Sequence, residues 1–193
     1  MTRQDDMQAP GRVRPKFTYD DYLALPDDGR RHELIDGEHF VTPSAERRHQ
    51  ELSLRLVTAV SGFVRRNRIG VVYCAPLDVI LSDTDVVEPD ILYVSNERSE
   101  ILGRWVHGAP DLVVEILSPS TRKVDEAIKR RLDGRVDVTQ YWIVDPELEI
   151  VKVYRRADDG SFPRIAELAR ESADTLTTPL FPGFALSLSE LFA

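Results

Sequence analysis

Two acidic residues stand inside apolar stretches of the sequence, where an ionised side chain is costly to bury. Asp90 lies in VVEPDILYV (86–94), and Glu115 lies in APDLVVEILSP (109–119). Segments this rich in Val, Ile and Leu are typical of strands that are covered on at least one face. A carboxylate there costs several kcal/mol to desolvate unless a cation or hydrogen-bond donors compensate it. The pair therefore indicates a shared cation.

Strand geometry sharpens this prediction. Alternate side chains share a face, so Glu115 lies on the face that carries Leu117, and Asp90 lies on the face that carries Leu92. If the two strands are neighbours, the two carboxyl groups come within a few ångströms, and like charges that close cannot both stay ionised without a cation. Ligation by carboxylates, a backbone carbonyl and water is the coordination that Mg²⁺ or Mn²⁺ prefers. We therefore expect Mg²⁺ or Mn²⁺ as the cofactor.

Composition limits the class of protein. The 193 residues are 42% hydrophobic and 30% charged, which suits one domain with a sizeable core. The formal net charge of −8 argues against a general nucleic-acid binder, although a local basic groove stays possible. The single cysteine, Cys74, excludes an intrachain disulfide framework. No apolar run resembles a signal peptide or a membrane span, so we expect a cytoplasmic protein without a membrane partner.

The patterns predict a disordered tail over residues 1–15 and a single domain over residues 16–193. The tail is polar and is interrupted by prolines and a glycine. The domain begins with Thr18 and Asp21, which have the spacing of a capping box, so we expect a short helix over residues 19–25.

A hairpin and a long helix follow. Asp36–Gly37 between two apolar runs is a type I′ hairpin signal, which places Glu33 on the first strand. From Ser44, a predicted N-cap, the pattern changes to a helical period that ends near Asn67 to Gly70. The apolar stripe of this helix holds His49, Leu52, Leu56, Val60 and Phe63.

The rest of the chain alternates strand and helix patterns, which predicts one α/β domain. The predicted strands lie at about 71–73 and 77–81, in the Asp90 and Glu115 segments, and at 139–146 and 150–156. A helix is predicted over about 122–132, and the C-terminal segment is expected to be irregular and to close with a short helix.

As an ordered series, these motifs resemble the "putative restriction endonuclease" family of the PD-(D/E)xK nuclease superfamily. The resemblance runs from about Phe17 to the C-terminus. The motifs that carry it are HELIDGE, the helix start Pro43…His49-Gln50, VVEPDILYV, GAPDLVVEILSPST, Asp125…Lys129 and QYWIVDP.

The resemblance implies a restriction-endonuclease-like core, with a central mixed sheet of about four strands flanked by helices. Asp90 matches the acid of the PD element, and Glu115 matches the second acid. The backbone carbonyl of Ile116 would be a further metal ligand, and Glu33 matches an acid that completes the metal shell in the family. The implied activity is metal-dependent hydrolysis of phosphodiester bonds in DNA.

One position departs from the superfamily pattern. A lysine usually stands two residues after the second acid, where this chain has Leu117. The family commonly carries the lysine on the following helix, and Lys129 matches it there. The resemblance therefore implies that Lys129 lies near the attacking water. Restriction-type nucleases often act as dimers, so a homodimer is also implied as a possibility.

Each residue also has a structural alternative. Asp125 and Lys129 stand at i,i+4 spacing, which suits a surface ion pair of about 0.3–0.5 kcal/mol. Glu33 suits a cross-strand charge on the hairpin, and Glu115 suits a buried bridge to an arginine. His49 suits a hydrogen-bonded core histidine better than a general base. For the whole protein, the alternative is a catalytically inactive nuclease fold that serves as a binding or regulatory module, which the net charge and Leu117 favour.

Overall fold

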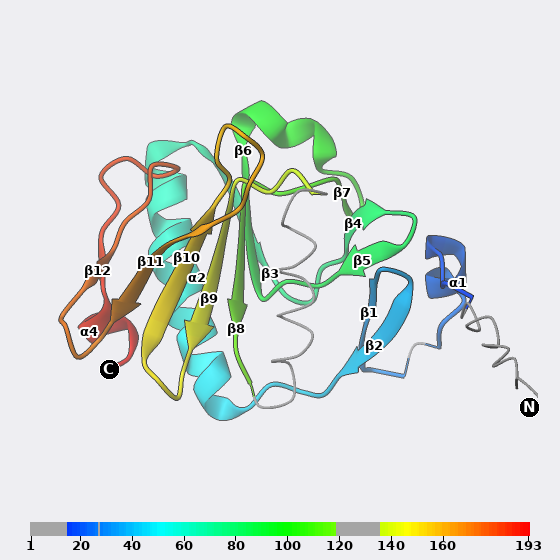
Figure 1. Ribbon diagram of the computed structural model, residues 1–193, viewed down its shortest axis with the longest axis horizontal. Coiled ribbons are helices and arrows are strands. Elements are labelled where there is room, and N and C mark those ends of the chain that lie inside the picture. The colour runs from blue at the N-terminus through cyan, green and yellow to red at the C-terminus, as the bar shows by residue number, and fades with distance from the viewer. Residues whose placement is uncertain (1–14, 27, 119–135) are drawn as a thin grey trace, which may run out of the picture.

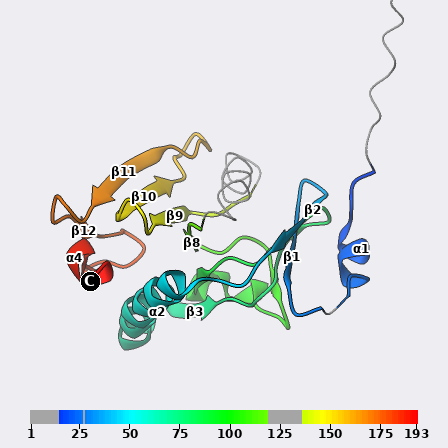
Figure 2. The same ribbon diagram turned by 90° about the horizontal axis from the view of Figure 1, so that it is seen from below.

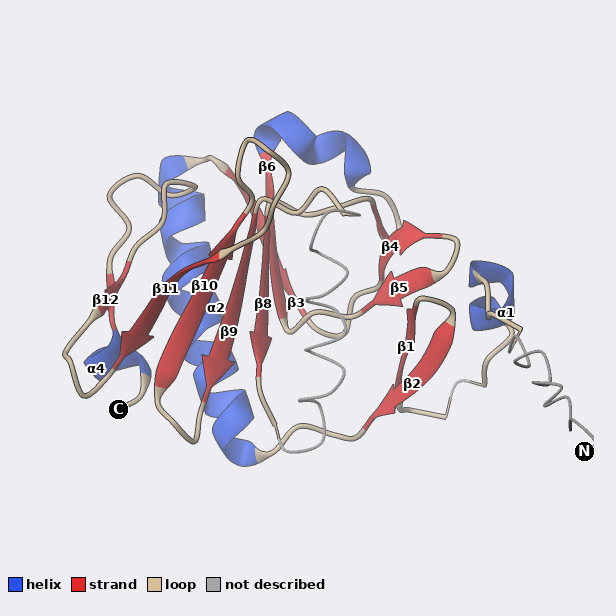
Figure 3. Cartoon of the chain, viewed as in Figure 1, coloured by secondary structure: helices blue, strands red, loops and turns tan. Residues whose placement is uncertain are grey.

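The computed structural model describes residues 15–26, 28–118 and 136–193. The predicted disordered tail, apart from its last residue, and the predicted helix that carries Lys129 lie outside these residues. The described strands form two main sheets, shown to the left and right of Figure 1 and in red in Figure 3. The architecture is a mixed α and β fold, as the sequence predicted.

The larger sheet has six described strands in the order β11-β10-β9-β8-β6-β3. Its central pair, β8 and β9, is parallel, whereas the other pairs are antiparallel. The bounds are β3 Gly70–Cys74, β6 Ile91–Ser95, β8 Leu112–Ile116, β9 Gln140–Asp145, β10 Ile150–Arg155 and β11 Arg164–Ala169. β11 was not predicted, because its sequence RIAELA is short and only weakly alternating, with charges at its first and fourth positions.

The smaller sheet has five described strands in the order β2-β1-β5-β4-β7. Its bounds are β1 Arg31–Ile35, β2 Glu38–Thr42, β4 Val79–Ser82, β5 Asp85–Val87 and β7 Val106–His107. The predicted hairpin joins β1 and β2, and both turn residues, Asp36 and Gly37, have the positive φ of a type I′ turn (57° and 70°). The short pair β12 (Thr175–Leu176) and β13 (Leu186–Ser187) completes the described strands.

The long helix α2 (Arg47–Asn67) packs on one face of the larger sheet (Figure 2). Leu52, Leu56, Val60 and Val64 enter a core with Val114, Ile116, Trp142 and the C-terminal residues. The opposite face of the sheet carries a second apolar cluster that includes Leu92, Val113 and Leu117. The other helices in the described part of the chain are α1 (Tyr19–Leu23), the 3₁₀ segment η1 (Asn96–Ile101) and α4 (Leu188–Leu191).

Two element boundaries differ from the sequence prediction. VVEPDILYV, predicted as one strand, breaks between β5 and β6, because Pro89 lacks an N–H and restricts the residue before it. The break sends β5 to the smaller sheet and β6 to the larger one. The long helix begins at Arg47 with Glu46 as its N-cap, not at Ser44, where no acid stands three residues later to form a capping box.

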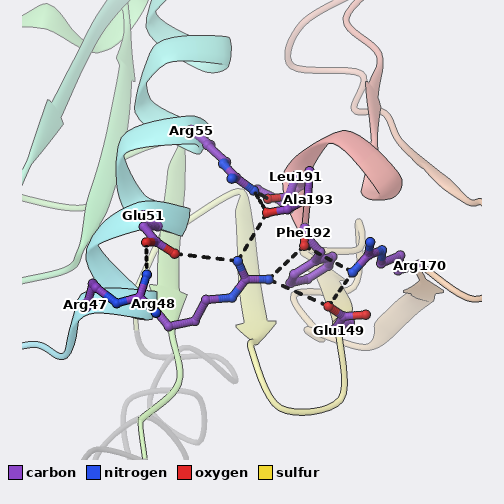
Figure 4. Close-up of polar contacts among 9 residues, drawn as sticks. All are labelled: Arg47, Arg48, Glu51, Arg55, Glu149, Arg170, Leu191, Phe192 and Ala193. Atoms are coloured by element: carbon purple, nitrogen blue, oxygen red, sulfur yellow. Dashed lines mark hydrogen bonds and ion pairs between the residues drawn. The ribbon is translucent and has the colours of Figure 1, made fainter.

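Three arginines, two of them on α2, donate hydrogen bonds to backbone carbonyls of the C-terminal segment (Figure 4). Arg48 Nη2 donates to the carbonyl of Phe192 at 2.8 Å, and Arg55 Nη1 donates to that of Leu191 at 2.9 Å. Arg170, just after β11, donates to the same Phe192 carbonyl at 3.2 Å. Charged donors are the stronger class of hydrogen bond, so these contacts hold the first turns of α2 in place. No helix in the described ranges has the length and apolar character to cross a membrane.

We predict that Leu56→Ala lowers the free energy of unfolding by about 2–5 kcal/mol, because it leaves a cavity between α2 and the sheet. Leu56 is fully buried, whereas Leu54 on the same helix is 69% exposed. Leu54→Ala is the matched control and should change stability by less than about 0.5 kcal/mol. Urea unfolding measures both, and equal losses would contradict the placement of α2.

Candidate active site

The two predicted acids meet at one end of the larger sheet. β6 starts directly after Asp90, and β8 ends with Glu115 and Ile116. The antiparallel register pairs Ile91 with Val114, so continuing it by one residue sets Asp90 opposite Glu115. Both side chains are 4% exposed. The structure therefore brings together the two acids that the sequence singled out.

Asp90 is held by three donors from three different elements. Its Oδ2 accepts a hydrogen bond from the Ile116 N–H at 2.8 Å and lies 3.0 Å from His49 Nε2. Its Oδ1 accepts from Arg31 Nη1 at 3.1 Å. Burial alone would raise the pKa of Asp90, but the bond from His49 and the charge of Arg31 bring it below its usual value. Asp90 is therefore an ionised carboxylate with a fixed orientation.

Arg31, the first residue of β1, supplies the positive charge. Its Nη2 lies 4.0 Å from Glu115 Oε2 and donates to the Glu88 carbonyl, and its Nε lies 4.0 Å from Glu88 Oε2. Burial disfavours the charged form of Arg31, yet the attraction of Glu115, Glu33 and Asp90 outweighs it and raises the pKa. One guanidinium thus lies near both acids that were predicted to share the cation.

Glu33 lies in the same cluster, with both of its carboxylate oxygens engaged. Oε1 accepts the Glu88 N–H at 3.0 Å, and Oε2 accepts the Thr42 hydroxyl at 3.3 Å. Burial raises the pKa of Glu33, and it raises that of Glu88 to about 7, with Arg31 acting in the opposite direction in both cases. Glu33 therefore fixes the backbone that enters Pro89 and Asp90.

Two further residues of the sequence hypothesis are placed as follows. The Ile116 N–H donates a hydrogen bond to Asp90. That the Ile116 carbonyl is a metal ligand stays a prediction. Leu117, which stands where the superfamily pattern has a lysine, is 7% exposed and packs in the second apolar cluster. Lys129 lies outside the described residues.

Arg31 was not among the predicted site residues, and the predicted role of His49 did not include a contact with Asp90. Because side chains alternate along RHELI, Arg31 lies on the same face of β1 as Glu33. This spacing could have identified Arg31 as a site residue. His49 is a buried, hydrogen-bonded histidine, as predicted, but its partner is Asp90 itself. Its Nδ1 has no hydrogen-bond partner among the described residues.

The donor chemistry fits a hard divalent cation. Within the described ranges, no three His, Cys, Asp or Glu side chains converge as a preformed metal-binding group. Mg²⁺, however, is commonly held by only one or two carboxylates, with water and substrate oxygens as its other ligands. Asp90 and Glu115 are such a pair, and they already lie around the positive charge of Arg31.

A pocket of about 160 Å³ adjoins this cluster. Its lining includes His49, whose Nε2 lies 3.0 Å from Asp90 Oδ2, and Leu117, and Arg48 contributes a positive charge. The pocket also has acidic residues in its wall, so its lining is not uniformly basic. The other lining residues are Glu46, Ser118, Asp145, Pro146 and Glu147.

A mixed sheet with two acids opposed on neighbouring strands defines a nuclease-like protein of the restriction-endonuclease class. The model of the Uma2 family, described as "Putative restriction endonuclease", matches residues 19–189. The chain belongs to this family.

Two individual proteins are similar to the chain. A crystal structure described as a putative nuclease of DUF820, from Anabaena variabilis, has a TM-score of 0.72 and 25% identity, and the match covers 91% of this chain and 97% of that one. The uncharacterised protein slr1290 of Synechocystis sp. is 26% identical over 156 residues, which are 80% of this chain and 82% of that protein.

We predict that Glu33→Ala lowers the free energy of unfolding by about 1–3 kcal/mol, because it leaves the buried Glu88 N–H without its acceptor. Glu33→Gln is the matched control. Its carboxamide can accept from that N–H and donate to the Thr42 hydroxyl, so it should cost less than about 1 kcal/mol. Thermal and urea unfolding at neutral pH measure both variants. Equal destabilisation would contradict the hydrogen-bonding role of Glu33.

Proposed function

We propose that the protein is a metal-dependent endonuclease that hydrolyses phosphodiester bonds in DNA. The observation that carries the proposal is the opposed pair Asp90 and Glu115, fixed around a positive charge at the end of adjacent strands. Family membership and the similar solved structure support a nuclease-like function. The metal, the DNA substrate and a homodimeric form are parts of this proposal.

Asp90 and Glu115 would hold Mg²⁺ or Mn²⁺, with the Ile116 carbonyl and water as further ligands. When bound, such an ion polarises a phosphoryl oxygen and lowers the pKa of a bound water. The low exposure of both carboxylates strengthens their electrostatic effect, because little water screens them.

The chain's own residues orient these ligands. The Ile116 N–H and His49 fix Asp90 Oδ2, so that Asp90 does not need to reorganise when it binds a cation through Oδ1. Glu33 holds the Glu88 N–H, which sets the turn before Asp90. Lys129, by resemblance, would lie near the attacking water, since Leu117 cannot act there.

Asp90→Asn and Glu115→Gln test the proposal. Each should reduce Mn²⁺ affinity by more than the ~10–100-fold typical of losing an outer partner of a metal ligand, and should abolish cleavage of plasmid DNA. Calorimetry with Mn²⁺ and a gel assay measure the two effects. The control is Asp111→Asn, a buried acid near the opposite end of β8 that accepts the Ser95 N–H at 2.7 Å. It should leave Mn²⁺ affinity unchanged.

Absence of Mn²⁺ binding by the wild-type protein at millimolar concentration would contradict the proposal. Metal binding without cleavage of DNA would instead support the inactive nuclease fold, which the buried Leu117 favours.

A further inference from the structure

The hydrogen bonds of Asp90 leave one of its oxygens for a cation. Oδ2 already accepts from the Ile116 N–H and from His49 Nε2, and these two donors occupy both lone pairs in the plane of the carboxylate. Oδ1 has one hydrogen bond, from Arg31 Nη1 at 3.1 Å. A cation shared with Glu115 must therefore use the oxygen that Arg31 contacts.

Arg31 is also the most exposed member of the group. Its side chain is 21% exposed, whereas those of Asp90 and Glu115 are each 4% exposed. The Arg31 side chain is therefore more accessible to solvent than either carboxylate. A divalent ion and a guanidinium on the same two carboxylates repel each other, and little water is present to screen them.

The guanidinium of Arg31 does not use all of its hydrogen-bond donors among the described residues. Nη1 donates to Asp90 and Nη2 to the Glu88 carbonyl, but Nε has no hydrogen-bond partner among the described residues. The distances to Glu115 Oε2 and to Glu88 Oε2, both 4.0 Å, are those of ion pairs and exceed hydrogen-bond length. Arg31 can therefore be displaced from the carboxylates at the cost of few hydrogen bonds.

We infer that Arg31 is a resident cation of this site, the one seen among the described residues, and competes directly with the divalent ion for Asp90 Oδ1 and Glu115. The inference rests on the proposed function and adds its regulation: metal affinity is set by the displacement of Arg31. Until an ion arrives, the charge of the guanidinium offsets those of the two buried carboxylates. A purely structural bridge would also stabilise the fold, but it would not oppose metal binding.

Calorimetric titration with Mn²⁺ tests the competition on the full chain. Arg31→Gln removes the competing charge, so its dissociation constant for Mn²⁺ should fall by about tenfold or more relative to wild type. Arg31→Lys keeps the positive charge but lacks the planar guanidinium, so its dissociation constant for Mn²⁺ should lie between those of wild type and Arg31→Gln. The matched control is Arg98→Gln, which removes an arginine that donates to the Asp137 and Ala109 carbonyls away from the site, and it should match wild type.

The outcomes separate this inference from the proposed function. Equal Mn²⁺ affinity of wild type and Arg31→Gln, or weaker binding by the variant, would overturn the competition while leaving the metal site standing. No Mn²⁺ binding by either protein would overturn the proposed function, and the inference with it. Tighter binding by the variant alone supports both.

A measurement on the unmodified chain covers the case in which Arg31→Gln does not fold. The Nε–H signal of Arg31 in a ¹H–¹⁵N spectrum can be assigned by its loss in Arg31→Lys. Addition of Mg²⁺ should move this signal towards the shift of exposed arginines and leave that of Arg98 in place. An Arg31 signal that does not respond to Mg²⁺ under conditions in which calorimetry detects binding would overturn the inference.

Discussion

The structure depends on groups that compensate the negative charges of two carboxylates buried at the end of a sheet. Asp90 and Glu115 face each other on adjacent strands, where two uncompensated charges would oppose folding. Among the described residues, His49 from α2 and the Ile116 N–H compensate Asp90, and Arg31 from the smaller sheet lies near both carboxylates. The site is therefore also the point at which both sheets and the long helix meet.

Pro89 makes this meeting possible. Because it interrupts the apolar run between Val87 and Ile91, the chain leaves the smaller sheet and enters the larger one within three residues. Asp90 falls directly after the break, where it is close to β1 and to the first turn of α2. Glu33 secures the same crossing through the Glu88 N–H. An uninterrupted strand would have kept Asp90 away from Arg31.

The sequence predicted the local features whose causes are local. The Asp36–Gly37 turn, the Thr18 capping box and the apolar stripe of α2 all follow from neighbouring residues, and the structure has them. The opposition of Asp90 and Glu115 was also predictable, because it needs only two neighbouring strands. The role of Arg31 was not predicted, since it depends on how the smaller sheet packs against the larger one, and periodicity does not report this. The break at Pro89 was missed because an apolar run can continue across two strands that belong to different sheets.

The most direct test of this account is the anomalous scattering of a crystal soaked in Mn²⁺. A single strong peak is expected within ligand distance, about 2.0–2.6 Å, of Asp90 and Glu115 oxygens. The Arg31 guanidinium is expected to have left Asp90 Oδ1. A peak elsewhere, no peak at millimolar Mn²⁺, or an ion bound while Arg31 still contacts Asp90 Oδ1 would contradict it.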